Sequence, residues 1–178
     1  MNDDQAQLFR HLFDTIARPL ISGAEEDYGR LIRFVELNDE ETNQSLFGEI
    51  LAVRGGREVL ENLFFTMARD QKPGLRVLGR VLTSDTTASF GDRFQSEIRL
   101  GEKSPCLGLI SALPEFMSHS WGRSVLAATL LDRDSDIRDG ASQTLFALMG
   151  EDCGYDPTDP PAEREAMVQE ILGAAGRS

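Results

Sequence analysis

Apolar residues recur at spacings of three and four along nearly the whole chain, and this pattern constrains the fold more than any other feature. Such spacing is typical of amphipathic α-helices, whereas a half-buried β-strand alternates apolar and polar residues. The chain has two tyrosines, one tryptophan and no sustained alternating run rich in Val, Ile and Thr. The sequence therefore predicts an all-α protein.

About ten helices are expected, most of them about 10 to 16 residues long and joined by connections of about two to six residues. Their apolar stripes are Leu8–Leu20, Tyr28–Leu37, Leu46–Leu51, Val59–Met67, Leu75–Leu82, Phe90–Ile98, Cys106–Leu113, Trp121–Leu130, Ile137–Leu148 and Ala166–Leu172. This distribution of lengths is typical of antiparallel helix pairs in bundles and solenoids. Paired off, the helices give about five units of roughly 35 residues each.

Caps and prolines set the expected helix boundaries. The first helix should run from about Gln5 to Leu20 and be kinked or ended by Pro19, and Pro73 should stand at the first position of a later helix. Side chains that can cap helices are expected in the segments 38–41, 84–86 and 135, and Ser104-Pro105 should start a further helix. The length of 178 residues fits a single domain over 1–178, with 150–161 as a loop rich in Gly, Pro and Asp before the last helix.

The charge excludes several classes of function. Thirty acidic against 18 basic side chains give a net charge of −12, and Lys72 and Lys103 are the only lysines, so general nucleic-acid binding is disfavoured. The longest uncharged runs contain 11 residues, too few for a membrane span, and the N-terminus is acidic where a secretory signal is basic. Cys106 and Cys153 lie in unlike contexts and are expected as unpaired thiols. These features favour a cytoplasmic protein without membrane insertion, whose partner is neutral or basic.

One stretch, LLDRDSDIRDGASQTLFALMG from Leu130 to Gly150, has a more specific pattern. An acidic turn leads into Ile137-Arg138, then into a helix with Ala141, Leu145 and Leu148, and a segment with Tyr155 and Pro160-Pro161 follows. This stretch resembles a HEAT repeat, most clearly over residues 130–175, and the segment after it resembles the closing stretch of some bacterial HEAT-like proteins. The resemblance implies a right-handed α-solenoid of the armadillo/HEAT type, with about five antiparallel helix pairs. It also implies that an Asp caps the helix, that Arg138 reaches acids, and that Ala141 allows close helix approach.

Three patterns could indicate chemistry, but each is incomplete. Asp132, Asp134 and Asp136 match the first positions of an EF-hand calcium loop, yet Ile137 replaces its glycine and Gln143 its final glutamate. The two histidines, His11 and His119, lack further ligands at metal-binding spacing. Ser118-His119-Ser120 lacks a nucleophile elbow. We therefore expect no enzyme activity, no metal and no cofactor.

The candidate partner-binding residues are aromatic and basic. Trp121 begins a helix and Tyr155 lies in a loop, where rings often contact partners, although both could instead pack between helices. Arg123 follows Trp121 closely. Arg76 and Arg80 belong to the least acidic part of the chain, with Arg93 and Arg99, and could present a row of guanidinium groups or pair with local acids.

These observations predict a non-catalytic protein-binding module, a scaffold, adaptor or accessory subunit of a larger complex. The alternative is an acidic inhibitor or immunity protein that blocks a basic toxin or a nucleic-acid-binding site. Enzymes of the HEAT-like family, DNA glycosylases and bilin lyases, remain a third class. A glycosylase needs an electropositive groove that this composition can barely supply, and no residues diagnostic of a lyase are present.

Overall fold

The computed structural model describes residues 10–11, 13–24, 27–84, 87–150 and 153–175, and in this part of the chain the secondary structure is entirely helical. The predicted all-α class is thus confirmed. The chain divides into two compact units, unit 1 over residues 1–86 and unit 2 over residues 87–178, each treated by itself below. The division into two compact units does not decide whether residues 1–178 form one domain, so the expected single domain stays a prediction.

The described residues of unit 1 include a π-helical turn and five α-helices whose bounds are defined. They are η1 (Phe13–Ala17), α2 (Arg18–Ile21), α3 (Gly29–Leu37), α4 (Glu40–Leu51), α5 (Gly56–Arg69) and α6 (Leu75–Thr83). Helices α4, α5 and α6 all contact one another, and α2 contacts α5. The core between them consists of predicted stripe residues such as Leu31, Phe47, Leu60 and Leu78, each with no exposed surface. The period of three and four therefore located the buried faces correctly.

Two boundaries in unit 1 differ from the expectation. Helix α6 begins at Leu75 and not at Pro73, because Gly74 is its N-cap residue in a left-handed conformation with φ of 84°. A Cβ on Gly74 would lie 2.5 Å from Val35 Cγ1, so glycine is required there both by φ and by space. In the predicted first helix, the backbone changes from π-helix to α-helix at Arg18, and the α-helix continues through Pro19 to Ile21. Residues 1–9 and 12 lie outside the described residues.

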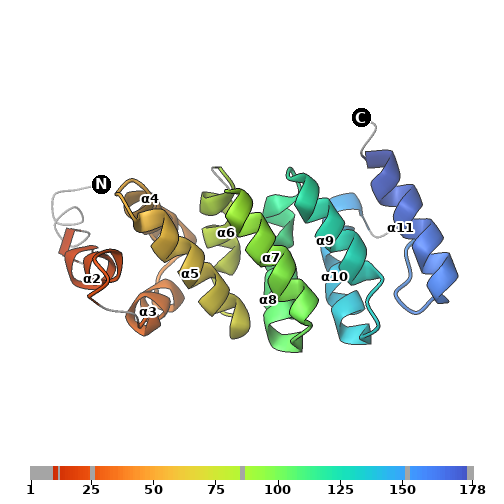
Figure 1. Ribbon diagram of the computed structural model, residues 1–178, viewed down its shortest axis with the longest axis horizontal. Coiled ribbons are helices and arrows are strands. Elements are labelled where there is room, and N and C mark those ends of the chain that lie inside the picture. The colour runs from red at the N-terminus through yellow and green to blue at the C-terminus, as the bar shows by residue number, and fades with distance from the viewer. Residues whose placement is uncertain (1–9, 12, 25–26, 85–86, 151–152, 176–178) are drawn as a thin grey trace. The chain divides into compact units, whose positions relative to one another are not determined.

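The described residues of unit 2 include five α-helices and a 3-10 turn whose bounds are defined. They are α7 (Ala88–Leu100), α8 (Lys103–Ala112), η2 (Leu113–Phe116), α9 (Ser120–Leu130), α10 (Ser135–Met149) and α11 (Pro161–Ala175). Helix α9 contacts α7, α10 and α11, while α8 contacts α7 and α10. Figure 1 shows the green to blue helices of this unit in that order, with α7 and α9 in front of α8 and α10.

Helix starts in unit 2 depend on side chains close to those expected. The hydroxyl of Thr87 accepts a hydrogen bond from Phe90 N at the start of α7. In the expected cap segment 84–86, the Ser84 hydroxyl donates to Val81 O, and residues 85–86 lie outside the described residues. Helix α10 is capped by Asp134, one residue before the predicted Ser135. The helix expected to start at Ser104-Pro105 begins one residue earlier, because α8 starts at Lys103, and its N-cap residue Glu102 makes no side-chain cap.

Candidate partner-binding surface

Five rings gather where η2 and α9 meet α7, and we call them the Trp121 cluster: Phe90, Phe94, Phe116, His119 and Trp121. The three phenylalanines are buried, whereas Trp121 and His119 are half-buried. The indole lies 5.1 Å from the Phe94 ring and 5.4 Å from the Phe116 ring, measured between centroids. The His119 ring stacks on it at 5.7 Å with an interplanar angle of 16°. Trp121 is therefore held rigidly at the edge of the core, with part of its surface accessible.

Two glycines allow the Trp121 cluster to close. A Cβ on Gly91 of α7 would lie 2.8 Å from Trp121 Nε1, so α7 approaches the indole more closely than any other residue permits. A Cβ on Gly122 would lie 2.3 Å from the carbonyl oxygen of Phe116, so the start of α9 can pack against η2 only with glycine there. Neither glycine has a positive φ, and their requirement is one of space alone.

Arg123 is not brought together with Trp121. The two residues are two positions apart on α9, and side chains at this spacing do not face each other on a helix. Arg123 is half-buried. A partner that contacts the indole would therefore reach Arg123 only by extending around α9.

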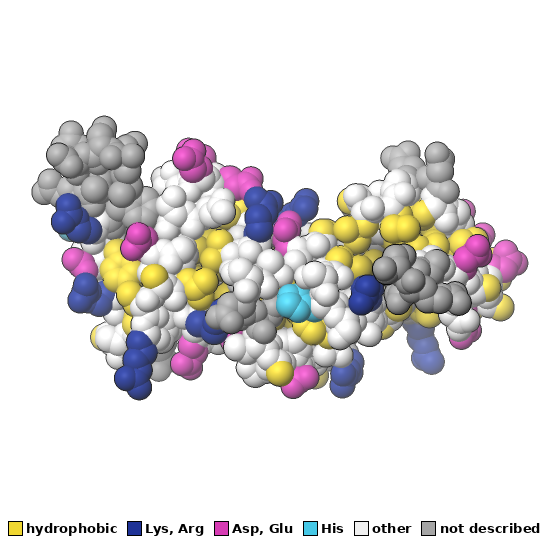
Figure 2. Space-filling model, turned by 90° about the horizontal axis from the view of Figure 1, so that it is seen from above, with side chains coloured by type: hydrophobic (Ala, Val, Ile, Leu, Met, Phe, Trp, Pro, Cys, Tyr) yellow, Lys and Arg dark blue, Asp and Glu magenta, His cyan; other side chains and the backbone are white. Residues whose placement is uncertain are grey.

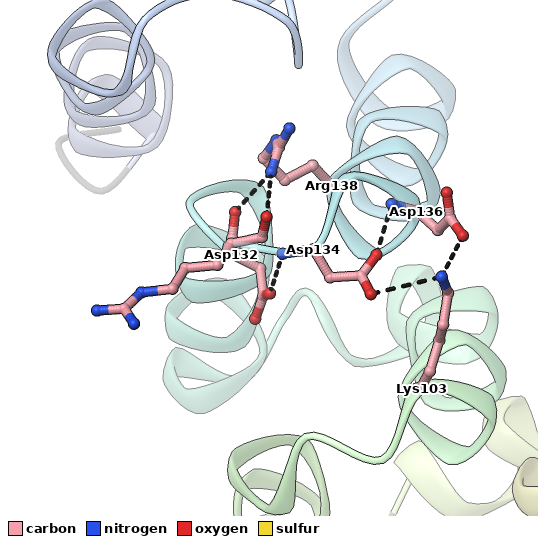
Figure 3. Close-up of polar contacts among 6 residues, drawn as sticks. Lys103, Asp132, Asp134, Asp136 and Arg138 are labelled. Carbon is pink, nitrogen blue, oxygen red and sulfur yellow. Dashed lines mark hydrogen bonds and ion pairs between the residues drawn. The ribbon is translucent and has the colours of Figure 1, made fainter.

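The acidic turn before α10 is used to build the helix start (Figure 3). Asp132 Oδ1 accepts a hydrogen bond from Asp134 N at 2.8 Å, and Asp134 Oδ1 accepts one from Asp136 N at 2.8 Å. The ammonium of Lys103, on α8, contacts the carboxylates of both Asp134 and Asp136. The hydrogen bond from the backbone N–H of Asp136 lowers the pKa of Asp134, and the contact with Lys103 lowers it further. The hydrogen bond from the ammonium of Lys103 to the carboxylate of Asp136 raises the pKa of Lys103. Lys103 thus joins α8 to the first turn of α10.

The same turn bears on the calcium hypothesis. Carboxylates that cap backbone N–H groups and pair with an ammonium do not point together at one ion. Within the described part of the chain, no three His, Cys, Asp or Glu side chains converge as metal ligands would.

Arg138 reaches carbonyls, not the acids that the HEAT-like resemblance implies. Its Nη1 donates to the carbonyl oxygens of Asp132 and Arg133, and its Nε donates to Pro157 O at 3.0 Å. A guanidinium in the first turn of α10 lies beside the chain entering that helix, whose carbonyls have no helical partners of their own. Arg138 therefore fastens both the turn before α10 and the loop after it. Sequence reasoning identified the residue but assigned it the wrong acceptors.

Tyr155 belongs to the core, which corrects its candidacy as a surface contact. It is 4% exposed, and its hydroxyl donates to the carbonyl oxygen of Leu130 at the end of α9. Burial raises the pKa of this hydroxyl, while the charges of Arg164 and Arg138 oppose the rise. The loop over residues 153–160 is anchored by this ring before α11 begins at Pro161.

Arg76 and Arg80 lie in unit 1, four residues apart on α6, and both are exposed. Arg80 Nη1 contacts Glu40 Oε1 of α4 at 2.6 Å, which favours the local pairing over a free row of guanidinium groups. Because the two units are not placed relative to each other, the structure does not join these arginines with Trp121, Arg123 or Tyr155 into one surface.

Unit 1 also has a surface groove of about 520 Å³, which sequence reasoning missed. Leu20, Ile21 and Val59 give it an apolar wall, and Tyr28, Glu58 and Asn62 add polar groups. These residues come from two helices, α2 and α5, and from the turns beside them, so no local motif could reveal the groove.

Both cysteines are free thiols. Cys106 is buried on α8, and burial raises its pKa to about 11, which disfavours the reactive thiolate at neutral pH. Cys153 is half-buried.

Comparison with known proteins found no matching family model, no matching curated protein and no matching solved structure. Among the described helices, none combines the length and the apolar character needed to cross a membrane.

Proposed function

We propose that this chain is a non-catalytic protein-binding module, a scaffold, adaptor or accessory subunit, built as a HEAT-like α-solenoid of antiparallel helix pairs. The packing of unit 2 carries the proposal, because α9 contacts both α7 and α11, while α8 contacts α10. Such contacts between alternate helices fit helix pairs stacked side by side, each pair touching the next. Stacked pairs leave long helix faces open, and proteins of this architecture use such faces to hold other proteins.

The turn from Asp132 to Arg138 also supports the HEAT-like interpretation. Asp134 caps α10 and Ala141 has no exposed surface. A Cβ on the neighbouring Gly140 would lie 3.0 Å from Leu107 Cδ2 of α8, so small residues let the two helices approach. Leu148 departs from the pattern, since it is 40% exposed at the end of the helix.

The proposed contact surface is the accessible part of the Trp121 cluster, extending to Arg123. Aromatic rings that are rigidly held and partly exposed are common anchors in protein interfaces. Arg76 and Arg80 would belong to a separate contact in unit 1. The net charge of −12 favours a neutral or basic partner, and the protein is expected to act in the cytoplasm.

The test is co-purification of a partner with the tagged full chain from its native cells. Trp121→Phe keeps an aromatic ring in the cluster but removes the indole edge, and it should reduce the captured partner at least about fivefold. Leu100→Ala is the matched control, because Leu100 is 69% exposed on α7 and lies outside the Trp121 cluster. Equal capture by wild type and by Trp121→Phe, with the fold verified by circular dichroism, would refute this surface.

An acidic inhibitor is the second candidate, and the charge excess is the observation that favours it. Figure 2 shows acidic and basic side chains interspersed on the drawn face of each unit, with hydrophobic patches between them. An inhibitor that acts through its carboxylates would lose its partner steeply between about 0.05 and 0.5 M salt, whereas binding through helix faces would change little. The salt series on the captured complex therefore separates the two functions.

A further inference from the structure

The groove of unit 1 has an apolar wall that a ligand can reach. Leu20 of α2 and Val59 of α5 belong to this wall and are buried, at 7% and 5% exposure. Ile21 and Tyr28 also line the groove and are half-buried, so part of their surface is open to a ligand. Its volume of about 520 Å³ lies within the range of about 300 to 1,000 Å³ that is typical of ligand sites. The groove therefore offers both space and accessible apolar surface.

Two glycines at the edge of the groove add no side chain to it. Gly23 has a φ of 71°, and a Cβ placed on it would meet nothing within 4 Å beyond its chain neighbours. Gly55, the N-cap residue of α5, has a φ of 87°, and its Cβ would lie 3.6 Å from Ile21 Cγ2. Both left-handed conformations favour glycine, so the backbone itself keeps these two positions of the groove open.

Glu58 supplies the charge of the groove. It is exposed in the first turn of α5 and is the one charged side chain among the described residues that line the groove. Within the described part of the chain, its carboxylate has no ion-pair or hydrogen-bond partner, and the neighbouring Arg57 pairs instead with Glu61 at 3.4 Å. Asn62, one turn further along α5, lies on the same helix face as Glu58 and also lines the groove. An unpaired carboxylate thus stands beside accessible apolar surface.

We propose that this groove binds a lysine or arginine side chain together with its apolar neighbours in a segment of a partner protein. The aliphatic stem of such a side chain covers apolar surface while its charged end stays in water, which matches Ile21 and Tyr28 beside Glu58. A hydrogen bond between two charged groups is stronger than a neutral one, so Glu58 favours a basic segment over a neutral or acidic one.

Two further properties favour a protein segment as the occupant. The volume of about 520 Å³ leaves room for the residues on either side of the basic side chain. The net charge of −12 attracts a basic segment to the chain. The inference rests on the proposed protein-binding function and adds a contact in unit 1, whereas the Trp121 cluster belongs to unit 2.

The test is titration of the full chain with blocked pentapeptides, followed by fluorine NMR of fluorotyrosine. The chain has two tyrosines: Tyr28 lines the groove and reports binding, and Tyr155 is buried in unit 2 and is the internal control. The peptides are Ala-Leu-Lys-Leu-Ala and the same sequence with Arg, norleucine or Glu at its centre. The Lys and Arg peptides should shift the Tyr28 signal with a dissociation constant of about 1 mM, and the other two should bind at least about threefold more weakly.

Glu58→Gln removes the charge and should weaken binding of the Lys peptide about threefold, while binding of the norleucine peptide stays the same. Glu41→Gln is the matched control, because Glu41 is likewise exposed in the first turn of a helix, α4, and is not among the residues described as lining the groove. Glu41→Gln should bind all four peptides as wild type does.

Three results would overturn the proposal: equal binding of the Lys and Glu peptides, a Tyr28 signal that no peptide moves, or unaltered affinity for the Lys peptide in Glu58→Gln. Hexylamine is titrated in parallel, and if it binds as tightly as the Lys peptide, the groove is a site for a free amine and the proposal is wrong. The Tyr28 signal is measured without the native partner, whereas Trp121→Phe is tested by capture of that partner. The groove and the Trp121 cluster can therefore fail independently.

Discussion

At the scale of single residues, two helical glycines have opposite consequences. Gly91 faces the indole of Trp121, and a Cβ there would meet Nε1 at 2.8 Å and Cδ1 at 2.9 Å. Gly48 is exposed on α4, and a Cβ there would meet nothing within 4 Å. The first glycine is required by packing, whereas the second only adds flexibility to a helix.

Gly91→Ala should therefore destabilise the protein by about 1 to 3 kcal/mol, because the indole must move within a cluster of buried rings. Gly48→Ala is the control and should stabilise by about 0.5 to 1 kcal/mol. Urea unfolding followed by circular dichroism measures both, and tryptophan fluorescence reports the movement of the single indole. Equal effects of the two substitutions would contradict the close approach at Gly91.

At the scale of elements, the start of α10 combines a cap and an ion pair. The side chain of Asp134 both caps the helix and contacts Lys103. The side chain of Asp136 contacts Lys103 but does not cap the helix. Asp134→Ala should lower the melting temperature by roughly 2 to 6 °C, because a cap is lost. Asp136→Ala should lower it less, since exposed ion pairs stabilise little. A larger loss for Asp136→Ala would show that Lys103, and not the cap, determines the stability of this turn.

Arg138 joins α10 to the loop before α11 through its hydrogen bond to Pro157 O. Arg138→Lys should cost about 2 kcal/mol, because one ammonium cannot reach three carbonyls that a guanidinium reaches in different directions. Hydrogen exchange should increase most over residues 153–160. Arg133→Lys, at an exposed side chain of the same turn, should leave exchange unchanged. Unaltered protection in Arg138→Lys would mean that Tyr155 alone anchors the loop.

The elements were predictable where local pattern decides the outcome. Stripes such as Leu31, Ile32 and Val35 became buried faces, because helix periodicity is itself the signal of burial. Pro73 misled, because Gly74 is the N-cap residue of α6, and the lack of space for a Cβ there comes from Val35, distant in sequence. Arg164 stands between two glutamates in the sequence, and its burial on α11, which packs against α9, depends on tertiary structure. The groove in unit 1 and the stacking of His119 on Trp121 likewise arise from tertiary packing, which one sequence does not reveal.

At the scale of the whole molecule, hydrogen-bonded carboxylates and paired lysines occur in both units. Hydrogen bonds from Thr42, Asp136 and Thr158 lower the pKa of Asp39, Asp134 and Asp156, respectively. A hydrogen bond to Glu36 raises the pKa of Lys72, as Asp136 does for Lys103. The folded state therefore binds fewer protons at these carboxyls, and more at these lysines, than the unfolded state.

Stability should consequently be highest on a plateau between the ordinary pKa values of 3.8 for Asp and 10.5 for Lys. The carboxylates stabilise the folded state above pH 3.8, and this stabilisation is lost as the pH falls through their lowered pKa values. The lysines stabilise the folded state below pH 10.5, and this stabilisation is lost as the pH rises through their raised pKa values. Melting temperatures measured across the pH range test this. Asp134→Asn should flatten the acid limb, and an acid limb identical to that of wild type would contradict the assignment.

The two lysines give each unit one natural reporter. Lys72 Nζ contacts Glu36 Oε1 at 2.9 Å in unit 1, and Lys103 contacts two aspartates in unit 2. An amine reacts with acylating reagents only when it has lost its proton, so pairing with carboxylates slows the modification of both side chains. Mass spectrometry of a briefly acylated sample would therefore show, lysine by lysine, which unit loosens first when the protein is heated or bound. Because the chain has two lysines, one in each unit, the acylation of each lysine reports on the contacts between helices that its ammonium makes.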